Sequence, residues 1–287
     1  MTGLRVAGRR QAPGPCPRVP DVERVLQRNC VRLAGSPESR PLMFAHGFGC
    51  DQQMWRFVVP EFEADHRIVL FDHVGAGRSD LSAYDRERYN SLRGYAADVV
   101  EICRALELTD VVFVGHSVSA MIGVLALQAA PDVFGALVMI GPSPRYVDDA
   151  DYVGGFSRTD IAGLLDVLDA NHLGWSAQMA PVIMGTPDRP EQAAELTNSF
   201  CRTDPDIIRH FARVTFLSDN RADLATVQVP TLVLQCSDDV IAPEVVGRYV
   251  HEHIPGSVFT QLAATGHCPH LSAPEETAAA LRAFLTG

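Results

Sequence analysis

Short apolar segments rich in Val, Ile, Leu and Phe alternate along the chain with longer segments whose apolar residues recur at helical spacing. The short segments carry little polar alternation, which is typical of strands buried on both faces of a parallel sheet. Strands are predicted at 41–47, 67–73, 111–117, 136–142, 231–237 and 257–263. Helices are predicted at 91–108, 119–130 and 274–285. This alternation predicts an α/β fold with a mostly parallel sheet.

The segment 148–218 departs from the alternation because it contains no strand-like run. Its helical patterns are separated by Gly, Pro and Asn signals. Ligand sites of open α/β sheets lie at the carboxyl ends of the strands, so we expect this segment to form a helical cap over a pocket there. The chain is therefore divided into a core of residues 23–147 and 219–287 and a cap of residues 148–218.

The N-terminal segment and the cysteines carry little structural signal. Residues 1–22 are basic and rich in proline, and they lack the apolar stretch of a secretory signal. We expect them to form a disordered extension and the protein to be cytoplasmic. The seven cysteines are scattered without a C-x-x-C pair, so neither a disulfide framework nor a zinc site is predicted.

Length and charge exclude several classes of function. A chain of 287 residues with 47% hydrophobic and 21% charged residues has the composition of a globular protein with one large domain, or one domain with an insert. Its net charge is −11 and no cluster of Lys and Arg occurs, which argues against a nucleic-acid or anionic membrane partner. The apolar runs are far shorter than the roughly 20 residues that span a bilayer.

The strongest chemical signal is Gly115-His116-Ser117-Val118-Ser119, which joins a predicted strand directly to a predicted helix. A nucleophile elbow has this strand–turn–helix context, and its tight turn needs small residues two before and two after the nucleophile. Gly115 meets that need, whereas Ser119 is small but is not the usual glycine. Ser117 is the candidate nucleophile; the alternative is that it only caps the helix.

A serine nucleophile needs a base, and the base needs an acid that orients it. In this type of fold the chain order is serine, acid, histidine. His267 follows a predicted strand in a short polar loop, and His270 is its only serious rival. Asp238 and Asp239 both lie just beyond the strand 231–237, and their spacing does not separate them.

The developing oxyanion needs two preorganised N–H donors. We expect one from Val118, the residue after the nucleophile, and one from Phe48, which lies between two glycines in the loop 46–49. The glycine-containing stretch 71–79 lacks the third glycine of a dinucleotide fingerprint and is interpreted as a structural turn. Neither a metal nor another cofactor is predicted.

Several longer motifs resemble the RsbQ-like group of the α/β-hydrolase superfamily, which contains the bacterial stress-response regulator RsbQ and the plant karrikin and strigolactone receptors. They are HGFGCDQQMW (46–55), DHVGAGRSD (72–80), GHSVSAMIG (115–123), MIGPSPRY (139–146), FLSDNRADL (216–224), LQCSDDVIAP (234–243) and GHCPHLS (266–272). Ser119 belongs to this group's version of the elbow. The resemblance implies the α/β-hydrolase fold with an inserted helical cap. It also implies a triad of Ser117, Asp239 and His267, because three residues and then Pro243 follow the family's acid.

The resemblance also implies a ligand and a role. Phe48, Phe156, Trp175 and Phe216 match positions that line a hydrophobic pocket in the group. The expected activity is that of a serine hydrolase cleaving a small hydrophobic ester or lactone. The resemblance favours a regulator of a stress-response pathway, with a protein partner such as a phosphatase. The alternative is a purely metabolic esterase or enol-lactonase without a signalling partner. A haloalkane dehalogenase is disfavoured because that chemistry places Asp where Ser117 stands.

Overall fold

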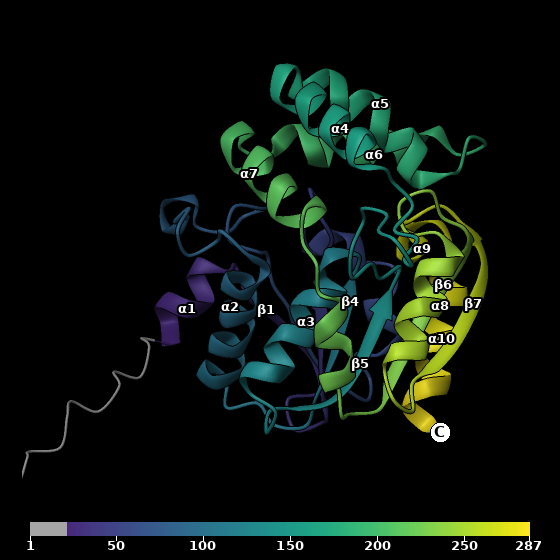
Figure 1. The fold of residues 1–287 in the computed structure, drawn as a ribbon. Helices are drawn as coiled ribbons and strands as arrows, with labels where there is room; N and C mark the ends of the chain where they lie inside the picture. Colours follow the sequence, from purple (N-terminus) through teal and green to yellow (C-terminus); the bar gives the residue numbers. More distant parts are fainter. Residues whose placement is uncertain (1–21) are drawn as a thin grey trace, which may run out of the picture.

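The central element of the fold is a seven-stranded sheet in a computed structural model, which describes residues 22–287 (Figure 1). The strand order is β1-β3-β2-β4-β5-β6-β7, and β1 alone is antiparallel to its neighbour. The strands are β1 (Arg32–Gly35), β2 (Pro41–Ala45), β3 (Arg67–Leu70), β4 (Val111–His116), β5 (Phe134–Ile140), β6 (Thr231–Asp238) and β7 (Val258–Thr265). The predicted α/β fold class is confirmed.

Six of the seven strands coincide with the predicted apolar segments, and the exception is β1. This edge strand is only four residues long and mostly exposed, so it has no apolar run. The predicted N-terminal extension, residues 1–22, lies outside the described residues apart from Val22, which begins a short helix.

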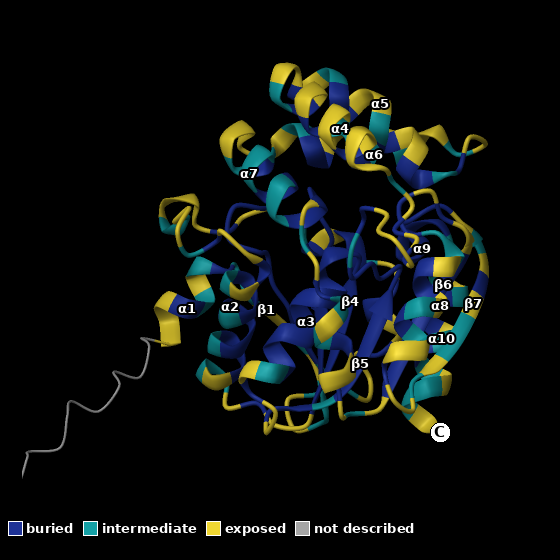
Figure 2. Ribbon diagram, viewed as in Figure 1, coloured by how far each residue is buried: buried dark blue, intermediate teal, exposed yellow. Residues whose placement is uncertain are grey.

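Alternate side chains of the strands enter two separate apolar layers. Met43, Val69 and Phe113 pack with the helices on one face, while Leu42 and Val112 pack on the other. The helices of the core are α1 (Val22–Arg28), α2 (Leu92–Ala105), α3 (Val118–Ala129), α8 (Glu244–His253), α9 (Pro269–Ser272) and α10 (Pro274–Thr286). Short 3₁₀ turns span Gln52–Trp55, Val59–Glu61, Leu81–Ala83 and Arg221–Thr226. The five inner strands, β2 to β6, are therefore mostly buried, while the edge strands β1 and β7 and the outer sides of the helices are exposed (Figure 2).

Four further helices form a separate layer above one end of the sheet (Figure 1). They are α4 (Arg158–Ala170), α5 (His172–Met184), α6 (Pro190–Arg202) and α7 (Pro205–Phe216), and all fall within the range expected for the cap. A capping box formed by Ser157 and Asp160 starts α4, and Gly185 ends α5 in the left-handed conformation. Among residues 22–287, no helix is long and apolar enough to cross a membrane.

Candidate active site

Ser117 stands at a sharp turn between β4 and α3. The strand ends at His116 and the helix begins at Val118, so a single residue separates them. The backbone of Ser117 has φ 57° and ψ −123°, which residues with a side chain rarely adopt. A strained residue of this kind costs about 1–3 kcal/mol and persists only where the surrounding structure holds it. The strain itself therefore marks Ser117 as a candidate functional residue.

The two small residues of the elbow meet across this turn. A Cβ atom on Gly115 would lie 2.4 Å from the carbonyl oxygen of Ser119, so a larger residue does not fit there. The hydroxyl of Ser119 has hydrogen-bond partners outside the elbow. Its Oγ donates to the carbonyl of His46 at 2.5 Å, and Nε2 of His73 lies 2.8 Å from Oγ of Ser119. The serine that replaces the usual glycine thus ties the elbow to the loop after β2.

Ser117, His267 and Asp239 form a continuous chain of hydrogen bonds. Nε2 of His267 lies 2.7 Å from Oγ of Ser117, and Nδ1 of His267 lies 2.7 Å from Oδ2 of Asp239. Because the ionised carboxylate can only accept, Nδ1 carries the proton and Nε2 accepts from the serine hydroxyl. All three residues are at least 95% buried, which keeps competing water away from the chain of bonds.

The two aspartates that spacing could not separate have different surroundings. Oδ1 of Asp239 accepts the backbone N–H groups of Ile241 and Ala242 at 2.9 and 3.1 Å, which leaves Oδ2 for the histidine. Asp238 is the last residue of β6 and is exposed, and only its backbone carbonyl bonds toward the histidine loop, accepting from Gly266. The structure therefore brings Asp239, and not Asp238, to the ring of His267.

His270, the rival base, lies away from the nucleophile. Its ring packs against Trp55, with centroids 4.6 Å apart, and against His116 at 4.4 Å. Burial lowers the pKa of His270 to about 3, and burial together with the neighbouring His270 lowers the pKa of His116 well below its usual value. Both imidazoles are therefore neutral, and neither makes a hydrogen bond to Ser117.

The loop 46–49 lies against the elbow. A Cβ atom on Gly47 would lie 2.6 Å from Nδ1 of His116 and 3.3 Å from Cβ of Ser117, so this glycine permits the close approach. Within the described residues, the N–H of Phe48 takes part in no backbone hydrogen bond of the loops. The N–H of Val118 belongs to the first turn of α3, where no helical acceptor exists. Both N–H groups expected for the oxyanion are thus left without a helical or loop partner.

An apolar cavity lies between the elbow and the cap. Phe48, Trp175 and Phe216 line it, as the resemblance implied, together with Ser117 and His267. Its other lining residues are Cys50, His116, Tyr146, Leu164, Met179, Ile183, Leu196, Phe200, Thr215, Ile241 and Cys268. The cavity volume is only about 30 Å³. Burial raises the pKa of the Tyr146 phenol to about 12, which keeps this lining residue neutral.

Phe156 is the one expected pocket residue that the cavity lining lacks. It lies in the segment that leads to α4, where its backbone pairs with Val147 and its N–H donates to the carbonyl of Tyr146 at 3.2 Å. This pairing fixes Phe156 beside the connecting segment rather than under the cap helices.

Other cavity residues were not predicted, although a helical pattern could have indicated them. Trp175, Met179 and Ile183 follow one another at intervals of four along α5, which places them on one face of that helix. All three line the cavity. The same spacing, started from Trp175, would therefore have indicated which side of the predicted cap helix faces the pocket.

A parallel sheet with a strained serine at the turn after its central strand defines an α/β-hydrolase. The model of the alpha/beta hydrolase family matches residues 42–280, and the chain belongs to this family. It is an enzyme of the hydrolase class.

Relatives of known name agree with this assignment. The chain is 38% identical over 252 residues to a probable esterase of Oryza sativa subsp. japonica, covering 88% of this chain and 93% of the relative. It is 38% identical over 262 residues to a strigolactone esterase of Arabidopsis thaliana, covering 91% and 97%. Among solved structures, a hydrolase from Oleispira antarctica is similar with a TM-score of 0.90 and 41% identity, covering 93% of this chain and 97% of that one.

Proposed function

We propose that this chain is a serine hydrolase that cleaves small hydrophobic esters or lactones with Ser117, His267 and Asp239 as its catalytic residues. The observation that carries the proposal is the unbroken chain of two hydrogen bonds, each 2.7 Å long, from the serine hydroxyl to the carboxylate. A histidine held in one tautomer by a buried carboxylate acts as a general base toward the serine.

The geometry supports acyl transfer to water. His267 takes the proton of Ser117 as the serine oxygen attacks the carbonyl carbon, and the imidazolium then gives that proton to the leaving alkoxide. Water next attacks the acyl-enzyme, with the same imidazole accepting its proton, and releases the carboxylic acid. Asp239 stabilises the imidazolium in both halves of the reaction and holds its ring in place.

The N–H groups of Phe48 and Val118 serve as the oxyanion hole in this proposal. The glycines on either side of Phe48 allow its loop to lie against the elbow, and Gly49 has φ +68°, which favours glycine. Preorganised donors aimed at the developing negative charge supply a large part of the catalysis in acyl transfer.

The cavity favours a small and largely apolar substrate. Its lining is mostly aliphatic and aromatic, and the polar lining groups are few. A volume of about 30 Å³ holds only one or two water molecules, so an ester reaches Ser117 only when the cap helices move apart. The cap therefore controls access to the nucleophile.

A regulatory role in a stress-response pathway is the second part of the proposal. It is supported by relatives at 38% identity, some of which are named as receptors and others as esterases. One of the receptors is the karrikin insensitive 2 receptor CA of Petunia hybrida. In this role a cap that closes over a ligand would present its outer surface to a protein such as a phosphatase. Capture of a phosphatase only when ligand is present would support this role. Fast turnover of one metabolite without such capture would favour a metabolic esterase or enol-lactonase.

Hydrolysis of a short-chain nitrophenyl ester tests the proposed activity. Ser117→Ala is expected to lower kcat/KM by at least about 10³-fold, because the attacking oxygen is removed. Ser237→Ala, an exposed serine at the end of β6, is the matched control and should retain the wild-type rate. Equal rates for Ser117→Ala and the wild type would contradict the proposal.

A further inference from the structure

Three metal-ligating side chains meet beside the active site without a role in the proposed hydrolysis. They are His116 at the end of β4, Cys268 just before α9 and His270 within α9. Each offers one ligand atom, and these atoms lie within 4.8 Å of one another. All three residues are at least 98% buried. His116 is far from the other two in sequence, so only the fold assembles the group.

Three ring nitrogens of this His116–Cys268–His270 cluster lack partners. Within residues 22–287, Nδ1 of His116 and both ring nitrogens of His270 form no hydrogen bond although they are buried. A buried polar group without a partner is destabilising, and few such groups occur in folded proteins. Three of them in contact indicate a place where something else binds.

The hydrogen bond that His116 does make prepares its other nitrogen as a ligand. Nε2 of His116 lies 2.7 Å from the backbone carbonyl of His267, which can only accept, so Nε2 carries the proton. Nδ1 therefore keeps a free lone pair. A metal-bound imidazole commonly has this arrangement, with one nitrogen on the metal and the other donating to a carbonyl.

We propose that His116, Cys268 and His270 bind a zinc ion. Two imidazoles and one thiolate, with no carboxylate among them, suit Zn²⁺ rather than Mg²⁺ or Ca²⁺. Tetrahedral zinc ligands of this kind lie roughly 3.5 Å apart, so the donors close by about 1 Å on binding. The thiol of Cys268 loses its proton to solvent as the zinc–sulfur bond forms, while both imidazoles bind in their neutral form.

The position of the cluster makes the zinc ion an inhibitor, a consequence that rests on the proposed function. Cys268 and His116 also line the substrate cavity, so an ion held between them occupies space that a substrate needs. His116 is bonded to the backbone of His267, and Cys268 is the next residue after that histidine. Movement of the donors toward the ion therefore displaces the ring of His267 from Ser117.

Titration of the purified full-length protein with zinc sulfate, followed calorimetrically in two buffers of different ionisation enthalpy, tests the site. The wild type should bind one zinc ion per chain at this site with release of about one proton. Cys268→Ser and His270→Gln should each weaken binding at least 10-fold. Cys201→Ser and His253→Gln, which change the same residue types away from the cluster, should bind as the wild type does.

The outcomes separate this site from the triad. Ser117→Ala should bind zinc normally, whereas loss of binding in Asp239→Asn but not in Cys268→Ser would place the ion on the triad and overturn the proposal. Circular dichroism establishes that each variant is folded. If one of the two cluster variants, Cys268→Ser or His270→Gln, does not fold, zinc binding by the other tests the site. Unchanged binding in a folded cluster variant, or no binding at 100-fold excess of zinc over protein, would also overturn it.

Activity measurements test the inhibition separately. Zinc should inhibit nitrophenyl ester hydrolysis by the wild type at the concentrations that fill the site, and the inhibition relative to each protein's own zinc-free rate should weaken at least 10-fold in Cys268→Ser. Binding without inhibition would overturn the inhibitory role. A protein that binds zinc at the cluster but hydrolyses no ester would refute the proposed function and leave the metal site supported.

Discussion

At the scale of single residues, the surroundings of a carboxylate decide whether it can orient a histidine. Asp239 uses one oxygen for two backbone N–H groups and the other for Nδ1 of His267, so its position is fixed by three bonds. Asp238 is its neighbour in sequence, but only the backbone carbonyl of Asp238 bonds to the histidine loop, where it accepts from the N–H of Gly266. An adjacent pair of like residues thus has one member built into the site and one exposed to solvent.

Substitution of each aspartate by asparagine tests this difference. Asp239→Asn should lower kcat by about 10³–10⁴-fold with little change in KM, because the amide no longer favours the tautomer in which Nε2 accepts from Ser117. Asp238→Asn should remain within about twofold of the wild type, since its side chain is exposed. Ester hydrolysis at several substrate concentrations provides both constants. A larger loss in Asp238→Asn would reverse the assignment.

At the scale of elements, the strand–turn–helix of the elbow depends on close approach between backbones. The carbonyl of Ser119 occupies the space that a side chain at position 115 would need. The hydroxyl of Ser119 in turn holds the loop 46–49 through the carbonyl of His46. The nucleophile and the candidate oxyanion donors are therefore positioned by the same few contacts, and a change in one of them affects both.

Gly115→Ala measures the steric requirement of this element. The added methyl group clashes with backbone, so the free energy of unfolding should fall by about 1–3 kcal/mol and ester hydrolysis should fall with it. Gly163→Ala is the control, because no atom outside the local helix backbone and the chain neighbours lies within 4 Å of a Cβ at that position of α4, and alanine favours a helix there. Urea unfolding should show Gly163→Ala to be as stable as the wild type or slightly more stable. A stable and active Gly115→Ala would contradict the argument.

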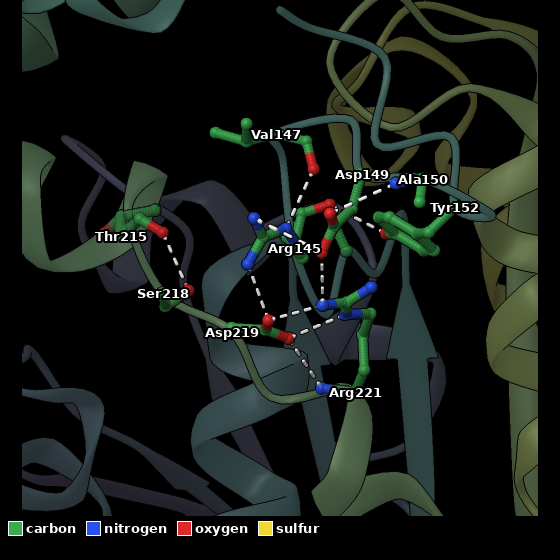
Figure 3. Close-up of polar contacts among 10 residues, drawn as sticks. Arg145, Val147, Asp149, Ala150, Tyr152, Thr215, Ser218, Asp219 and Arg221 are labelled. Atoms are coloured by element: carbon green, nitrogen blue, oxygen red, sulfur yellow. Dashed lines mark hydrogen bonds and ion pairs between the residues drawn. The ribbon is translucent and has the colours of Figure 1, made fainter. Parts of the chain in front are cut away.

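At the scale of the whole molecule, the two chain segments that connect the cap to the core are tied together by charge (Figure 3). Arg145, on the segment leading into the cap, pairs with Asp219, on the segment leading out of it, at 2.5 Å. Arg221 pairs with Asp149 at 3.0 Å and with Asp219 at 2.7 Å. The N–H of Asn220 also donates to the carbonyl of Pro144 at 2.8 Å. The two connections between cap and core are therefore held together by a network rather than by a single bond.

Acid should weaken this network in a defined range of pH. The hydrogen bonds from Arg221 lower the pKa of Asp219 from 3.8 to about 2. The ionised carboxylate of Asp219 therefore contributes fully to the free energy of unfolding above about pH 4. That contribution is lost as the pH falls through about 2. Because the side chain is about a third exposed, solvent screening limits that contribution to about 1 kcal/mol. Asp219→Asn should therefore unfold more easily than the wild type at pH 7, with a difference about half as large at pH 3.

Urea unfolding at both pH values measures this difference. Asp188→Asn changes an aspartate whose side chain is 78% exposed and whose nearest cation lies 3.8 Å away, so it serves as the control and should match the wild type at both values. A difference between Asp219→Asn and the wild type that stays constant from pH 7 to pH 3 would show that the carboxylate contributes no ionic stabilisation.

The sequence by itself determined the α/β fold, six strands of the sheet, and the local motifs around Ser117 and His267. These features depend on the period of apolar residues and on turns of a few residues. Both are determined by residues that are close to one another in the sequence. The edge strand β1 was not predicted, because it is short and mostly exposed and so has no apolar run. The helical stripe from Trp175 could have been found from its spacing, and Phe156 was placed under the cap by resemblance alone.

Spacing left the two adjacent aspartates open, and the family resemblance alone pointed to Asp239. Only the tertiary structure shows how Asp239 meets the histidine, and which scattered cysteine and histidines come together. The position of the Asp239 carboxylate depends on the turn after β6, where two backbone N–H groups hold it. His116, Cys268 and His270 have no metal-binding spacing in the chain, because β4 and α9 are far apart in sequence and meet only in the fold. The approach of β4 to α9 leaves no periodic trace in either segment, so the period of apolar residues does not predict this cluster.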